Sequence, residues 1–198
     1  MKISVVAVGL KMPKWADEAC EDYLHRFPSD WKLELKTVKA EDRNTRTIPK
    51  VMQAEAERIR AALPKDAIKV IMDERGADPT STKLAQQINR WGDQGRPIAF
   101  IIGGADGIDP GLKAEADFTL RLSSLTLPHA MARVLLLEQI YRSWSLLQVF
   151  DSYCCSAVKT YYRSTCSVLW CCKMELLSGC NFVLTEGKLF TAITDHPS

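Results

Sequence analysis

The sequence predicts an α/β fold, in which an open and mostly parallel β-sheet carries helices on both faces. Short apolar runs that suit buried strands alternate along the chain with longer segments of helical periodicity, through about five such units. Glycine, proline or polar clusters separate each run from the next. With 198 residues, of which 46% are hydrophobic, the chain is long enough to build one such domain around a real core.

The first part of the predicted domain supplies two strands and two helices. Residues 3–8 form a β-branched run that suits a buried strand, and a helix from Pro13 to about Arg26 follows it. Apolar and charged residues then alternate over 33–37, which predicts a second strand exposed on one side. An Ala-, Glu- and Arg-rich segment over 49–63 predicts the second helix by its composition.

The second part supplies three strands and three helices. We expect the strands at residues 68–72, 98–102 and 118–122. Polar residues 78–81 provide cap chemistry for a helix that ends at Gly92, and residues 110–116 can form a short helix. A long amphipathic helix begins at His129 and carries Val134, Leu137, Tyr141 and Trp144 on one face.

Three loops follow predicted strands of this sheet, at residues 72–76, 103–107 and 123–128. Open parallel sheets bind ligands beyond the carboxyl ends of their strands, so these loops define a candidate pocket. The pocket is rich in backbone N–H groups and suits a small molecule with adenine-like hydrogen-bonding edges. The competing interpretation is that Gly103, Gly104 and Gly107 form a simple turn.

Several classes of site are disfavoured. The segment IGGADG does not match G-x-G-x-x-G and follows the fourth predicted strand, so a nicotinamide site is not expected. The chain lacks a P-loop lysine, metal-spaced histidines and a G-x-S-x-G elbow, so we expect no metal. A net charge of +2 does not by itself indicate nucleic acid. No apolar run is long enough for a signal or a membrane span, and only Cys20 precedes residue 150, so we expect a reduced, cytoplasmic protein.

Polar side chains on the last helix are candidates for catalysis. His129 and Arg133 lie four residues apart and would share one face near the loops, although a histidine after proline is often a helix cap. Arg133 could equally pair with a carboxylate. Arg142 lies four residues after Glu138, the spacing of an ordinary ion pair on a helix.

Four separated motifs carry a resemblance to a known family: MKISVVAVGLKMPKW, DYLHRFP, AFIIGGADGI and LSSLTLPHAMARVLLLEQIYRSWS. They resemble the ribosomal RNA large subunit methyltransferase H family of the SPOUT class, in order and in spacing, over about residues 1–148. The resemblance implies a C-terminal trefoil knot and a homodimer. It also implies methyl transfer from S-adenosylmethionine to N3 of a pseudouridine in 23S-type rRNA, on the assembled ribosome.

The resemblance also implies roles for particular residues. The cofactor-binding set would be Met72, Gly103, Gly104, Ser123, Ser124, Leu125, Thr126, Leu127 and Pro128. Arg133, Arg142 or His129 would stabilise the ionised ring, and the sequence does not choose between them. The apolar breadth of the last helix, which includes Leu135, Leu136 and Ile140, suits a helix buried against a partner subunit.

The chain departs from the family pattern after residue 148. We expect a domain over 1–148 and an atypical tail over 149–198, which holds six cysteines, four basic and four acidic residues. The cysteine spacing lacks the C-x-x-C pairs of zinc modules, and disulfides would conflict with a cytosolic body. We interpret the tail as a shifted reading frame or a retained intervening sequence. It replaces the usual substrate-facing end, so we expect cofactor binding to survive and methylation to be impaired.

Two other functions stay open. The chain could be a non-catalytic protein of ribosome binding or assembly that keeps the fold, or an α/β protein that binds another adenine nucleotide. Ribosome co-sedimentation without methyl transfer would favour the first, and competition by S-adenosylhomocysteine would argue against the second.

Overall fold

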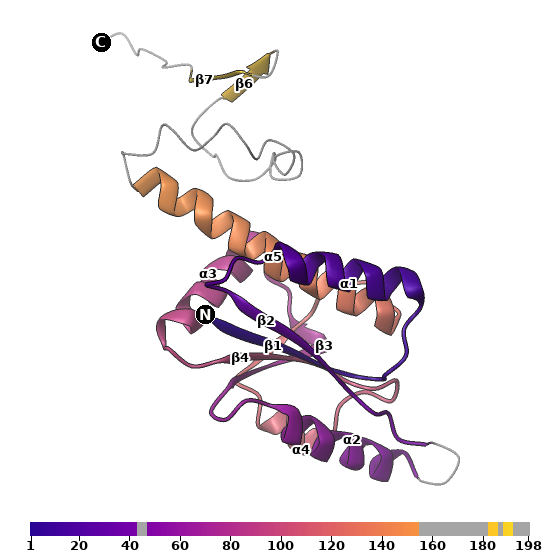
Figure 1. Cartoon of the computed structure of the whole chain (residues 1–198). Coiled ribbons are helices and arrows are strands. Elements are labelled where there is room, and N and C mark those ends of the chain that lie inside the picture. Colours follow the sequence, from indigo (N-terminus) through magenta and orange to yellow (C-terminus); the bar gives the residue numbers. More distant parts are fainter. Residues whose placement is uncertain (43–46, 155–181, 186–187, 192–198) are drawn as a thin grey trace. The chain divides into compact units, whose positions relative to one another are not determined.

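The structure is a computed structural model that describes residues 1–42, 47–154, 182–185 and 188–191 (Figure 1). It divides into two compact units, Met1–Cys154 and Cys155–Ser198. In the second unit the described residues form one antiparallel hairpin of β6 (Phe182–Thr185) and β7 (Lys188–Thr191). The other features expected of the tail, including its cysteines from Cys155 onward, lie outside the described residues.

The first unit is built on a five-stranded sheet in which every pairing is parallel. Its strands are β1 (Lys2–Val8), β2 (Lys32–Val38), β3 (Ile68–Ala77), β4 (Ile98–Ile102) and β5 (Phe118–Leu120). They lie in the order β2-β1-β4-β3-β5. All five residues of β4 are buried, as their continuous apolar run requires at the centre of a parallel sheet.

Helices cover both faces of the sheet, which confirms the predicted α/β class (Figure 1). On one face lie α1 (Lys14–Arg26), α3 (Ser81–Asp93) and α5 (His129–Cys154), and α5 packs against both of the others. On the opposite face lie α2 (Ile48–Ala62) and α4 (Pro110–Ala114). Apart from β3 and the end of α5, the elements match the predicted boundaries to within about two residues.

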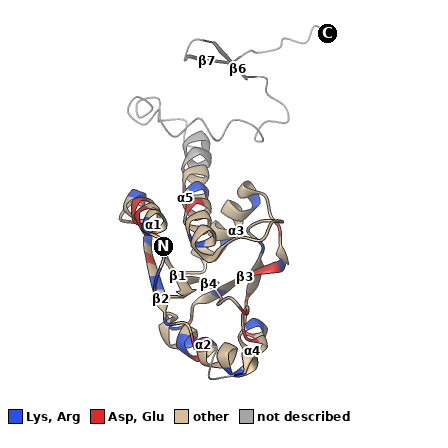
Figure 2. Cartoon of the chain, turned by 90° about the vertical axis from the view of Figure 1, so that its right-hand side faces the viewer, with Lys and Arg blue, Asp and Glu red and all other residues tan. Residues whose placement is uncertain are grey.

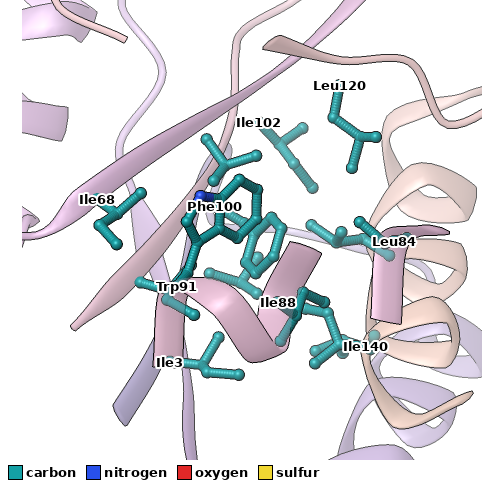
Figure 3. Close-up of a cluster of buried hydrophobic side chains, with 14 of the residues drawn as sticks. Ile3, Ile68, Leu84, Ile88, Trp91, Phe100, Ile102, Leu120 and Ile140 are labelled. Atoms are coloured by element: carbon teal, nitrogen blue, oxygen red, sulfur yellow. The ribbon is translucent and has the colours of Figure 1, made fainter. Parts of the chain in front are cut away.

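The larger core cluster lies between the sheet and the helices α1, α3 and α5 (Figure 3). Trp91 of α3 anchors it, with its ring centroid 6.5 Å from that of Phe100 and 5.4 Å from that of Phe118. Leu136 and Ile140 of α5 are fully buried in this same cluster. Their apolar character is therefore explained by packing within the chain, so these two residues give no sign of a partner subunit.

Strand β3 corrects the prediction that it would end at Met72. It continues to Ala77, and its pairing with β5 shifts so that both Met72 and Ala77 lie opposite Leu120. The intervening residues form a β-bulge, at which Gly76 lies so close to β5 that a Cβ atom would be 2.7 Å from the Leu120 carbonyl carbon. Polar residues 73–75 therefore belong to an irregular strand, which a search for apolar runs does not detect.

Candidate functional site

The three segments predicted to follow strands do meet at one edge of the sheet. Ile71 pairs with Ile101, and Met72 pairs with Leu120, so the ends of β4, β3 and β5 are neighbours. Met72 therefore lies between the glycine loop (residues 103–107) and the loop 123–128 that precedes α5. The sequence predicted this grouping correctly, because parallel strands bring all their carboxyl ends to one edge.

The glycine loop is a tight turn packed into its surroundings. Gly107 adopts a φ of +93° and donates its N–H to the Gly104 carbonyl oxygen at 3.1 Å. A side chain at Gly103 would collide with Ile108, and one at Gly104 would collide with the Glu55 carboxylate. Side chains of the protein thus pack against both glycines, and the turn bond from Gly107 to Gly104 supports the turn interpretation.

The loop 123–128 is held at its ends and open in its middle. Before it, Arg121 donates its N–H to the Ala77 carbonyl oxygen at 2.8 Å and pairs with Asp78 at 2.5 Å. Within it, the Leu125 N–H donates to Ser123 Oγ at 2.9 Å. Ser124, Leu125 and Thr126 are exposed, and the Leu125 side chain retains 75% of its accessible surface.

Arg133 is buried at the carboxyl end of β1. Its side chain is 1% exposed, and Nη2 donates to the carbonyl oxygens of Val8 at 2.6 Å and Gly9 at 2.7 Å. Burial lowers the pKa of the guanidinium from its ordinary value and raises the pKa of the neighbouring Cys20 thiol. Nη2 thus links α5 to the end of β1, whereas the buried Nε and Nη1 donate no hydrogen bond within the described residues.

The other two catalytic candidates lie at different places on α5. His129 is the first residue of the helix and is half-buried, beside the loop 123–128. Arg142 donates from Nε to Glu138 Oε1 at 2.8 Å, which confirms the predicted i,i+4 pair. At 1.5 Å per residue, Arg142 lies roughly 20 Å along the helix from His129. One copy of the chain therefore does not bring the three candidates together.

Sequence analysis missed a buried carboxylate beneath the glycine loop. Glu55 of α2 is 6% exposed, and its Oε1 accepts the Glu41 N–H at 3.0 Å. The sequence does contain a sign of this burial, because Glu55 lies four residues from both Val51 and Ile59 and so shares the apolar face of the helix. A charged residue at that position needs a partner or a function.

Asp73 lies at the start of the β3 bulge and is paired with Lys113 of α4. The hydrogen bond from Lys113, with a further one from the Arg75 N–H at 2.9 Å, lowers the pKa of the Asp73 carboxyl below its ordinary value. This pair fixes the first residue of the bulge next to Met72.

The remaining charges do not single out a binding face. Acidic and basic residues are interspersed along α1 and α2 (Figure 2). Within the part of the chain that the structure describes, no group of His, Cys, Asp and Glu could hold a metal ion. Over the same residues, no helix has the length and apolarity that crossing a bilayer requires.

Comparisons with known proteins match the first unit. The model of the family described as "Predicted SPOUT methyltransferase" matches residues 1–150. A protein of Methylibium petroleiphilum named ribosomal RNA large subunit methyltransferase H is 54% identical over 147 residues, which cover 74% of this chain and 94% of that protein. Proteins of the same name from Ralstonia pickettii and Burkholderia thailandensis are 52% and 54% identical over 149 residues, or 75% of this chain and 96% of each.

Proposed function

Because the chain belongs to the SPOUT methyltransferase family, we propose that it transfers a methyl group from S-adenosylmethionine to N3 of a pseudouridine in large-subunit ribosomal RNA. The proposal rests on one observation above all: the loops 72–76, 103–107 and 123–128 meet at the carboxyl edge of the sheet. The names of the similar proteins support the RNA substrate.

The residues at this edge fit the cofactor. We assign it to Met72, to the backbone of Gly103 and Gly104, and to Ser123, Ser124, Leu125, Thr126, Leu127 and Pro128. The tight turn of the glycine loop can offer backbone groups to the cofactor, and the open loop can close over a flat adenine ring. When bound, the cofactor supplies a methyl group already activated by a sulfonium, so the reaction needs no metal.

The protein must then align the ring nitrogen and stabilise its negative charge after N3 loses its proton. We assign direct contact with the substrate to His129 or Arg142. Arg133 has the different role of positioning, because its guanidinium holds the start of α5 against β1.

We further propose that the chain acts in the cytoplasm as a homodimer on the assembled ribosome. Leu10, Trp15 and Met131 support the dimer, because these large apolar side chains are exposed after the end of β1, at the start of α1 and near the start of α5. Sedimentation equilibrium tests this assignment, and a monomer mass at micromolar concentration would contradict it.

The decisive experiment combines two measurements on the full chain. Calorimetry with S-adenosylmethionine tests cofactor binding, and tritium transfer to ribosomes that lack the modification tests the reaction, with the product identified by nucleoside mass spectrometry. We expect binding with weak transfer, because residues 151–198 lie outside the family match. Absence of cofactor binding would overturn the proposed function, whereas rapid turnover would overturn the proposed impairment.

The altered C-terminus also favours a second function, that of a ribosome-binding or assembly protein without turnover. Co-sedimentation with ribosomes in the absence of any methyl transfer would support it. Mass spectrometry of the natural protein's C-terminus would show whether residues 149–198 are made in the cell.

A further inference from the structure

Glu55 is the buried charged group that the mechanism above does not use. It projects from the apolar face of α2 toward the carboxyl edge of the sheet, and only 6% of its surface remains exposed to solvent. An ionised carboxylate in such a place is unfavourable unless positive charges or hydrogen-bond donors face it.

The hydrogen bonds of Glu55 satisfy one of its two oxygens. Oε1 accepts the Glu41 N–H at 3.0 Å. The basic residue one turn further along α2, Arg58, is already engaged by the Lys39 carbonyl oxygen at 2.8 Å and by the Glu41 carboxylate. Among the described residues, no group donates a hydrogen bond to Oε2 and no cation forms an ion pair with it, and this oxygen keeps contact with solvent.

That second oxygen is directed at the glycine loop. It lies 2.3 Å from the position that a Cβ atom on Gly104 would take, and the carboxylate carbon lies 3.0 Å from the same position. Gly104 therefore lets a buried negative charge come within contact distance of the loop backbone. A residue with a side chain at 104 would displace that charge.

We propose that the Glu55 carboxylate binds the positively charged end of the cofactor at Gly104. This inference rests on the proposed function and adds to it an electrostatic contact from α2, on the face of the sheet opposite α5. The positive group is either the sulfonium or the ammonium of the methionine part. Both have the chemistry that a largely buried carboxylate would recognise when one of its oxygens has no partner within the protein and faces the glycine loop.

The test compares wild type with Glu55→Gln for three ligands, by calorimetry on the full chain. S-adenosylmethionine carries both positive groups, S-adenosylhomocysteine carries the ammonium alone, and methylthioadenosine carries neither. We expect the substitution to weaken the binding of S-adenosylmethionine roughly tenfold to hundredfold. The affinity for methylthioadenosine should stay unchanged. If the substitution also weakens the binding of S-adenosylhomocysteine, the ammonium is the group that Glu55 binds. If the binding of S-adenosylhomocysteine is unchanged, the sulfonium is that group.

The matched control is Glu57→Gln, which removes the same charge from the exposed side of the same helix. It should leave all three affinities unchanged. The glutamine at position 55 keeps an oxygen for the Glu41 N–H, so hydrogen exchange at that amide reports whether the local fold survives. Should Glu55→Gln fail to fold, the side-chain carbon resonance of Glu55 in the wild type should shift with S-adenosylmethionine and not with methylthioadenosine.

The possible failures are distinguishable. If the wild type does not bind S-adenosylmethionine, the proposed function fails and the role of Glu55 falls with it. If the wild type binds and Glu55→Gln binds all three ligands equally well, the role of Glu55 is refuted and the function stands. An equal loss for all three ligands, methylthioadenosine included, also refutes it.

Discussion

The glycine loop and the loop 123–128 meet at the same edge of the sheet, yet the first is fixed by its neighbours and the second is open. Ile108 and Glu55 fill the space beside Gly103 and Gly104. In the other loop, Leu125 is largely exposed, and its N–H bond to Ser123 is local. If the proposed function is correct, the glycine loop supplies a preformed surface and the loop 123–128 adjusts to the bound cofactor.

The strongest test of whether the glycine loop is held by its neighbours is Gly103→Val. The new side chain would collide with Ile108 and crowd the Gly107 carbonyl oxygen, so we expect a loss of about 3 kcal/mol in the free energy of unfolding, with cofactor binding lost as well. Urea denaturation measures the first effect. Ala105→Val, at an exposed position of the same loop, is the control and should cost less than about 0.5 kcal/mol. Equal stability of the two variants would show that the loop is not rigid.

Arg133→Met tests the tether that positions the helix after the open loop. The carbonyl oxygens of Val8 and Gly9 would lose their buried donor, so we expect a loss of about 2 kcal/mol in unfolding free energy. Arg90→Met removes the same charge from an exposed position on α3 and serves as the control. An unchanged midpoint in urea for Arg133→Met would mean that the two bonds do not hold α5 in place.

The Asp73–Lys113 pair gives the bulge beside Met72 a pH dependence. The pKa of Asp73 is lowered in the folded state, so the ionised carboxylate stabilises the fold at neutral pH. That contribution is lost as the pH falls through the folded-state pKa, below about pH 4. Lys113→Met should remove up to about 1 kcal/mol at pH 7 and make the acid limb of the stability curve shallower. Thermal melts of the wild type and of Lys113→Met from pH 2 to 7 would test this prediction. Identical dependence of the melting temperature on pH in the two proteins would show that the Asp73–Lys113 pair does not stabilise the fold.

Leu125→Ala should have the smallest effect on stability and a clear effect on binding. Because the side chain is exposed, we expect unfolding free energy to change by less than about 0.5 kcal/mol. Closure of the loop would bury that side chain, so the affinity for S-adenosylmethionine should fall roughly fivefold to tenfold. Ile48→Ala, an exposed apolar position on α2, is the matched control for calorimetry. If both variants bind alike, the loop does not close through Leu125.

Most of the fold followed from the sequence because the strands contain either a continuous apolar run or alternating apolar residues, and glycine, proline or polar residues separate them from the helices. The bulge in β3 escaped, since residues 73–75 are charged and Gly76 is explained only by its contact with Leu120. The end of α5 at Cys154 also differs from the domain boundary predicted at residue 148, because the helix continues beyond the last family motif.

The candidate site was predicted in part, for a physical reason. Periodicity placed the three loops at one edge, but it carries no information about where a long side chain ends. The burial of the Arg133 guanidinium and its bonds to Val8 and Gly9 therefore could not be predicted from the sequence. Glu55 was hidden in the same way, within a segment that its composition explained as a helix.

The bonds from Arg133 to Val8 and Gly9 join residues that lie 125 and 124 positions apart in the chain. During synthesis β1 leaves the ribosome first, and the helix that completes its surroundings leaves last. β2 and α2 can cover β1 early, because they are made soon after it, but the side of the core that α5 completes stays open until almost the whole domain has been made. A chain that ends before residue 133 would lack α5 and leave the core residues that pack against Leu136, Leu137 and Ile140 exposed, which favours aggregation.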